Sequence, residues 1–156
     1  MHAGFIENKI RIVKVIPEST KLLRRDVSDI HFQKDLKLTV YWKILEIGKG
    51  PSVIFSFRNK AIIRFDCFGK GDGHYHVYPD YNRIWFSEES ALEQVHLTKA
   101  ELKHSAQKYL DKYIENTDQA GHKQVRIDNS SFQTALNEME TMMIAFLNDI
   151  EELEGL

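Results

Sequence analysis

The spacing of hydrophobic residues changes once along the chain, near Ser87. Before this residue, apolar and polar side chains alternate in short runs that glycine and proline interrupt, whereas beyond it apolar residues recur every three to four positions. Alternation is typical of half-buried strands, and the longer spacing is typical of helices with one apolar side. A chain with strands first and helices second fits the α+β class. We therefore predict an antiparallel β-meander of four to five strands, packed on one face by two C-terminal helices.

The sheet is predicted to span residues 36–86. Its clearest strand alternates apolar with polar residues, and the apolar positions are Leu36, Leu38, Val40, Trp42 and Ile44. Further strands are predicted at residues 52–58, 61–68, 74–78 and 83–86. Residues 1–35 are expected to form an irregular N-terminal segment with one candidate strand at 9–16. Within this segment, the charged stretch at 18–35 has apolar spacings that a short helix could use.

The hairpin at residues 52–68 has two alternative registers. A two-residue turn near residue 59 would pair Phe55 with Arg64, and a three-residue turn would pair Phe55 with Phe65. We choose the second, because the first would bury Arg64 and Asp66 among apolar groups without compensation. The inner face of the sheet would then carry Val53, Phe55, Phe57, Ile63, Phe65, Cys67, Tyr75 and Val77.

The helical part is predicted at residues 87–156. Thr98 and Glu101 have the spacing of a capping box, so the first helix is expected from Lys99 to about residue 115. The last helix is expected at residues 131–153, where a continuous apolar stripe contains several methionines. Because the sheet needs a helix to cover it, we interpret this stripe as core. The alternative is that residues 131–153 form a homodimer or bind a partner protein, since Met-rich faces adapt to partners.

Length and composition favour one soluble domain. With 156 residues, of which 42% are hydrophobic, the chain supplies one ordinary core, so we predict a single domain over residues 1–156. The net charge of −2 gives no general reason to expect nucleic acid as a partner, although a local basic surface can still exist. The one cysteine, Cys67, forms no internal disulfide and fits a reducing compartment. No signal-peptide pattern and no membrane-length apolar stretch are found, so we expect a cytoplasmic protein without membrane contact.

One predicted hairpin holds the strongest candidate site of the sequence. Arg64 and Asp66 share one face of a strand, and His74 and His76 share one face of the next. The glycine-rich stretch at residues 69–73 connects the two strands. If all five of its residues stay out of the ladder, the opposed pairs are Phe68 with His74, Asp66 with His76, and Arg64 with Tyr78.

Acid–base catalysis is the first chemistry that fits this hairpin. A carboxylate opposite an imidazole raises the basicity of the ring, and a nearby arginine binds a phosphate or carboxylate. No residue is singled out as a nucleophile, so water or the substrate would supply it, as an RNA 2′-hydroxyl does in phosphodiester cleavage. We therefore assign Asp66, His76, His74 and Arg64 as candidate catalytic residues on an exposed sheet face. The alternative is a structural His–Asp pair.

Metal binding and phosphate binding are two further alternatives. Two imidazoles and one carboxylate suit zinc or ferrous iron, so the presence of a metal cofactor stays open. The glycines at residues 69–73 permit the backbone angles of an anion-binding loop. That loop leads into a strand rather than a helix and carries Asp72, so we prefer a tight turn as its interpretation.

The residues of the hairpin also carry a family resemblance. Arg-Phe-Asp-Cys-Phe-Gly at 64–69, followed by Gly-His-Tyr-His-Val at 73–77, resembles a signature of small bacterial proteins that share a domain of unknown function. An Arg-x-Asp strand before a His-x-His strand, in a meander that leads into helices, is similar to TumE-like toxins of bacterial toxin–antitoxin pairs. This similarity covers about residues 52–110. Where those toxins have a histidine-rich stretch between the strands, this chain has glycines.

Two functions from different classes follow. The resemblance to TumE-like toxins implies a small cytoplasmic protein that acts on RNA or translation and is held inactive by an antitoxin partner. In the other hypothesis the hairpin residues form a structural polar network, and the protein acts by binding a second copy or a partner through its Met-rich helix.

Overall fold

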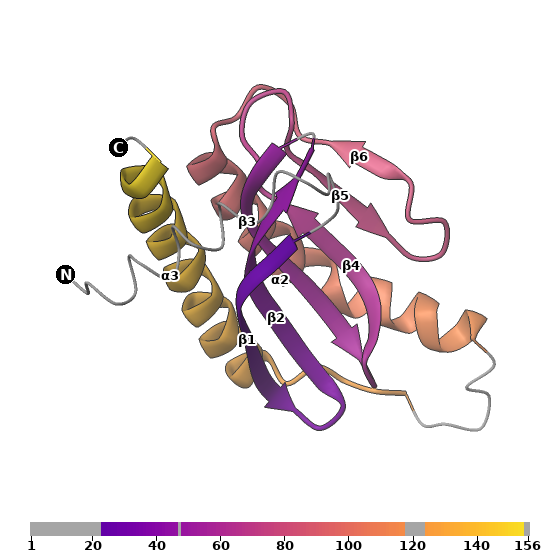
Figure 1. Cartoon of the computed structure of the whole chain (residues 1–156). Helices are drawn as coiled ribbons and strands as arrows, with labels where there is room; N and C mark the ends of the chain where they lie inside the picture. The colour runs from indigo at the N-terminus through magenta and orange to yellow at the C-terminus, as the bar shows by residue number, and fades with distance from the viewer. Residues whose placement is uncertain (1–22, 47, 118–123, 155–156) are drawn as a thin grey trace.

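The computed structural model describes residues 23–46, 48–117 and 124–154. Six strands form one antiparallel sheet in which each strand pairs with the next along the chain, and both helices pack against one face (Figure 1). The predicted α+β fold, a meander covered by two C-terminal helices, is confirmed. The elements are β1 Leu23–Gln33, β2 Leu36–Leu45, β3 Gly48–Phe57, β4 Lys60–Asp66, β5 His74–Val77, β6 Arg83–Trp85, α2 Ala91–Asn116 and α3 Asn129–Glu154.

The apolar core lies between the sheet and the two helices. Helix α3 contacts β1, β2 and β3, whereas α2 contacts β3 and β4. All eight residues predicted for the inner face belong to this core or pack against its edge. Met139 and Met143 of α3 are fully buried there, so the Met-rich stripe covers the sheet. A partner contact through residues 131–153 stays a prediction.

Strand β1 occupies a stretch for which the sequence indicated an irregular segment or a short helix. That prediction is wrong for Leu23–Gln33, and the sheet therefore has one strand more than expected. The register of β1 against β2 shifts twice, and Asp26 at the first shift has a φ of 55°. Such bulges interrupt the alternation of apolar and polar residues, and Val27 is 54% exposed as a result. The candidate strand at 9–16 lies outside the described residues.

The turn between β3 and β4 is formed by Arg58 and Asn59, which have φ values of 50° and 65°. Phe55 pairs with Ile63, so both predicted partners of Phe55 are wrong. The ladder shifts by one residue beside Phe55, which leaves Ile62 as the extra residue of a bulge. Because the bulge compensates for the shorter turn, the predicted division of the strands into inner and outer faces holds.

Helix α2 begins two turns before the predicted start. Ser90 is its N-cap, and the Ser90 hydroxyl accepts a hydrogen bond from the backbone of Glu93 while the Glu93 carboxylate accepts one from the backbone of Ser90. Thr98 does not cap a helix. It is buried within α2, where its hydroxyl lies 3.3 Å from Cys67 Sγ. Two capping-box patterns occur in this stretch, and the earlier one starts the helix.

We expect Ser90→Ala to lower the free energy of unfolding by about 1 kcal/mol, because the backbone N–H of Glu93 loses its partner. Ser87→Ala is the matched control, since Ser87 is exposed and precedes the helix. Urea denaturation of both variants measures the difference. Equal stabilities would show that the Ser90 cap contributes nothing to the fold.

Candidate functional site

The outer face of the sheet, which is the face opposite α2 and α3, carries two neighbouring rows of polar and aromatic side chains. Paired residues of adjacent strands share a face, so each row can be followed across the ladder. The first row contains Tyr41, Ser52, Asp66, His74 and Trp85. The second contains Thr39, Ile54, Arg64, His76 and Arg83. The register therefore brings all four candidate catalytic residues of the sequence together.

The pairs across the hairpin differ from the predicted ones. Asp66 pairs with His74 and Arg64 pairs with His76, which is a shift of two residues from the expected register. Strand β4 ends at Asp66, and the next backbone N–H, that of Cys67, still donates to Pro51 O of β3. The loop is thus two residues longer than the glycine-rich stretch. Since the shift is an even number of residues, the side chains keep their predicted face.

Gln94 of α2 fixes the loop between β4 and β5. Its amide oxygen accepts a hydrogen bond from Gly69 N, and its amide nitrogen donates to Gly69 O and to Glu89 O. A Cβ atom at Gly73 would overlap the Gln94 amide, so a larger residue there would displace that amide from its hydrogen bonds. The backbone N–H groups of Asp72 and Gly73 both donate to Gly69 O. The N–H groups of Gly69, Asp72 and Gly73 are thus engaged inside the protein, and the loop contains a turn, as preferred from the sequence.

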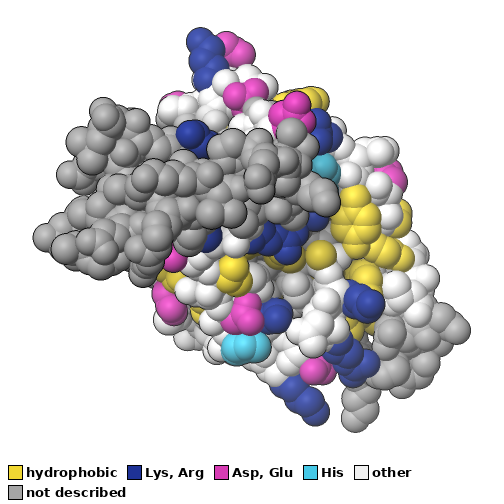
Figure 2. Space-filling model, in the orientation of Figure 1, with side chains coloured by type: hydrophobic (Ala, Val, Ile, Leu, Met, Phe, Trp, Pro, Cys, Tyr) yellow, Lys and Arg dark blue, Asp and Glu magenta, His cyan; other side chains and the backbone are white. Residues whose placement is uncertain are grey.

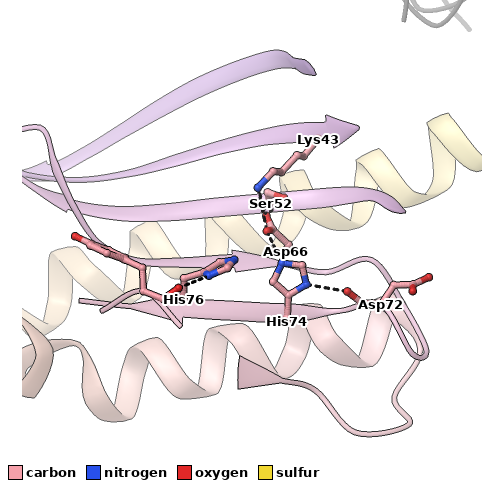
Figure 3. Close-up of polar contacts among 7 residues, drawn as sticks. Lys43, Ser52, Asp66, Asp72, His74 and His76 are labelled. Carbon is pink, nitrogen blue, oxygen red and sulfur yellow. Dashed lines mark hydrogen bonds and ion pairs between the residues drawn. The ribbon is translucent and has the colours of Figure 1, made fainter. Parts of the chain in front are cut away.

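Asp66 is the centre of the site and is 0% exposed. Ser52 Oγ donates to its Oδ1 at 2.8 Å, Lys43 Nζ lies 3.1 and 3.0 Å from its two oxygens, and His74 Nε2 lies 3.0 Å from Oδ2 (Figure 3). Burial raises the pKa of the Asp66 carboxyl, but the hydrogen bonds from His74, Lys43 and Ser52 outweigh it and hold the pKa far below its usual range. Asp66 is therefore ionised, and its negative charge is compensated.

This burial corrects the expectation of an exposed sheet face. Asp66 and His74 are fully buried and His76 keeps 8% of its surface exposed, while Arg64 is partly exposed. Sequence reasoning expected a buried charge to lack compensation. It did not pair Lys43 with Asp66, although Lys43 lies on the polar side of an alternating strand. The contact between Lys43 and Asp66 can be inferred only once β3 is known to align Ser52 with Asp66.

Both imidazoles are held by backbone carbonyls. His74 Nδ1 lies 2.9 Å from Asp72 O, and His76 Nδ1 lies 2.7 Å from Tyr81 O. A carbonyl oxygen only accepts, so Nδ1 carries the proton in each ring. The neutral form of each ring therefore has its lone pair on Nε2. The ring of His76 is turned so that its second nitrogen faces His74 and Asp66 (Figure 3).

The surroundings of the two Nε2 atoms differ. Burial lowers the pKa of His76, with the nearby charge of Arg64 acting in the same direction against the Tyr81 hydrogen bond, so His76 is a neutral base at pH 7. His74 Nε2 faces an Asp66 oxygen and has no other partner in the part of the chain that the structure describes. A hydrogen bond between these two atoms requires a second proton on the ring of His74.

Arg64 lies beside this cluster with unused hydrogen-bonding capacity. Its Nε is buried and has no hydrogen-bond partner among the described residues, and the same is true of the hydroxyl of Tyr41. The pKa of Tyr41 is raised to about 12, mainly by burial. The Arg64 side chain is close enough to oppose that rise and to lower the pKa of His76. A guanidinium with a free donor next to a neutral imidazole suits an anionic ligand.

Within the described part of the chain, Asp66, His74 and His76 also form a group suited to a metal ion. One ligand atom from each residue lies within 4.8 Å of the other two. Comparison of the chain with family models, curated proteins and solved structures gave no match. None of the described helices is long and apolar enough to cross a membrane.

Proposed function

We propose that this protein acts on RNA at the outer face of the sheet, as a cytoplasmic toxin of the TumE-like kind would. The observation that carries the proposal is the neutral imidazole of His76 next to the guanidinium of Arg64, whose Nε has no partner among the described residues. The first group can accept a proton, and the second can hold a phosphate. An antitoxin partner that covers this face in the resting cell belongs to the same proposal.

The charge of the outer face supports an anionic substrate. Arg24, Lys43, Arg64 and Arg83 project from its strands. Lysine and arginine side chains are visible on this side of the molecule, interspersed with acidic ones (Figure 2). The Asp66 carboxylate lies among them and is buried beneath Lys43 and His74. Phosphates of a nucleic acid backbone are the anions that such a face attracts.

Aromatic groups on the same face favour a single strand over a duplex. Trp85 is 53% exposed and packs edge-on to His74 with ring centroids 5.3 Å apart. The Arg83 guanidinium lies over the Trp85 ring, 5.3 Å from its centroid. Exposed aromatic rings of this kind stack on unpaired bases, and an adjacent arginine strengthens the contact.

The reaction that fits these groups is attack of a ribose 2′-oxygen on the adjacent phosphorus. A base held at the Asp66–His74–His76 cluster takes the 2′-hydroxyl proton, and Arg64 binds the phosphate oxygens while charge develops on them. The 5′-oxygen leaves and takes a proton from water. The products are a 2′,3′-cyclic phosphate and a 5′-hydroxyl. Because Asp66 and His74 are fully buried, the substrate contacts the cluster from the side of His76 and Arg64.

Incubation of the protein with a pool of fluorescently labelled, single-stranded RNA of random sequence tests this proposal. We expect cleavage by the wild type and a loss of at least about 100-fold in rate for Arg64→Met, since a phosphate-binding guanidinium acts mainly on the transition state. Arg58→Met is the matched control, because Arg58 is an exposed arginine at the turn between β3 and β4. No cleavage by the folded wild type, or equal loss in both variants, would refute the proposal.

A further inference from the structure

We infer that Asp66, His74 and His76 together bind one divalent transition metal ion of the zinc type. The inference concerns the cluster to which the proposed function assigns the base. It rests on the arrangement of the donor atoms and not on RNA as the substrate, so each proposal can fail without the other.

The first observation is the way in which the two imidazoles are held. Each ring donates its Nδ1 proton to a backbone carbonyl, that of Asp72 for His74 and that of Tyr81 for His76. Metal-binding histidines are typically fixed in this manner, because a hydrogen bond on one nitrogen sets the tautomer and leaves the other nitrogen to coordinate. Two carbonyls from separate loops perform the same task for two neighbouring rings.

The second observation is a buried atom that lacks a proper partner. Among the described residues, the buried His74 Nε2 has no hydrogen-bond partner that the Nδ1–H tautomer allows, although Asp66 Oδ2 lies only 3.0 Å away. In that tautomer both atoms offer lone pairs and repel each other. Either a proton or a cation must lie between them. A metal ion satisfies both atoms and needs no second proton on the ring.

The spacing of the three donors fits coordination by one ion. A tetrahedral ion with bonds of about 2.0–2.1 Å holds its ligand atoms about 3.3 Å apart. One donor atom from each of Asp66, His74 and His76 lies within 4.8 Å of the others, and the nearest pair is 3.0 Å apart. His76 comes from the same strand as His74, so the two rings are positioned by one rigid element.

The third ligand is itself supported. Ser52 donates to Asp66 Oδ1, which orients the carboxylate with Oδ2 toward His74. Ligating carboxylates are commonly held by such outer hydrogen bonds. Lys43 also contacts Asp66, and its ammonium repels a second cation. We therefore expect Lys43 to weaken binding relative to a site without it, and Lys43→Met to bind the ion more tightly than the wild type.

The donor set selects the class of ion and its chemistry. Two nitrogens and one oxygen suit zinc or ferrous iron, whereas magnesium and calcium prefer oxygen ligands throughout. Three protein ligands leave a position for water, and a zinc-bound water loses its proton near neutral pH. A hydroxide on the ion would be the base that the proposed reaction requires.

Isothermal titration with Zn²⁺, together with Co²⁺ absorption spectra, tests the inference on untagged protein that has been treated with a chelator. We expect one Zn²⁺ per chain, and binding at least about tenfold weaker in His74→Ala and His76→Ala. The matched control is His96→Ala, because His96 is an exposed histidine that pairs with Glu140 on the helical side. With Co²⁺ we expect the visible absorption of a four- or five-coordinate site. Circular dichroism shows whether each variant is folded.

The possible outcomes test the metal site and the RNA proposal separately. Absence of Zn²⁺ binding by the folded wild type, or equal binding by His76→Ala and the wild type, would overturn the metal site. RNA cleavage by protein without any bound metal would overturn the assignment of the base to an ion-bound hydroxide and would leave the RNA proposal intact. Stoichiometric Zn²⁺ that depends on His74 and His76, in a protein that cleaves no RNA, would support the metal site and refute the RNA proposal alone.

Discussion

Replacement of Asp66 by Asn is expected to lower the free energy of unfolding by about 3–5 kcal/mol. The substitution keeps the volume of the side chain but removes its charge, and Lys43, whose side chain is 4% exposed, then holds a buried charge without a counter-ion. Urea denaturation at pH 7 measures the difference.

Two further variants separate the charge effect from general sensitivity of the sheet. Asp29→Asn is the matched control, because Asp29 lies on the same face at the other edge with its side chain 39% exposed, and we expect a change within about 1 kcal/mol. Lys43→Met combined with Asp66→Asn should recover part of the loss, since both buried charges are then gone. A single Asp66→Asn variant as stable as Asp29→Asn would contradict the role of the pair.

The same interactions predict a direction for the pH dependence of stability. The pKa of Asp66 is lower in the folded state than in the unfolded chain, where a carboxyl titrates near about 3.9. Its contribution is therefore fully present above the unfolded pKa and is lost as the pH falls through the much lower folded pKa. In the pH range just below 4, the free energy of unfolding should therefore fall more steeply with decreasing pH for the wild type than for Asp66→Asn.

His76→Ala is expected to reduce RNA cleavage by at least about 100-fold, because the neutral imidazole supplies the base or binds the ion that carries it. The cost in stability should stay within about 1–3 kcal/mol, since the variant removes one hydrogen bond and leaves Tyr81 O to find water. His31→Ala is the matched control, because His31 lies on β1, which is remote from β4 and β5 in the order of strands. Single-turnover cleavage and urea denaturation are measured on the same samples. Loss of activity only in proportion to unfolded protein would argue for a structural histidine.

Local patterns in the sequence were sufficient to predict on which face of the sheet each hairpin side chain lies. Alternation placed Phe55 and Phe65 on the inner face and Arg64 and Asp66 on the outer one, and this held although both turn lengths were mispredicted. The reason is physical. Exposing a row of apolar side chains costs more than a bulge or a longer loop, so the ladder adjusts until the faces are correct.

Contacts between distant segments were beyond the reach of local patterns. The loop before β5 is held by hydrogen bonds between Gly69 and the side chain of Gln94, which lies on α2. Likewise the burial of Asp66 depends on Lys43, which lies two strands away. A charged residue predicts solvent exposure only when no partner is in reach, and the sequence alone does not give that distance. The four candidate residues could be named from the sequence, but their burial and their contacts with distant segments could not be predicted.

The most direct measurement uses DNA strands that contain a single ribonucleotide, in a set of four with A, C, G or U at that position. Only one phosphate in each strand has a neighbouring 2′-hydroxyl. We expect the wild type to cut at that phosphate in at least one strand and to leave a 2′,3′-cyclic phosphate and a 5′-hydroxyl. No cut in any strand, or cuts at positions without a 2′-hydroxyl, would contradict the proposed action on RNA.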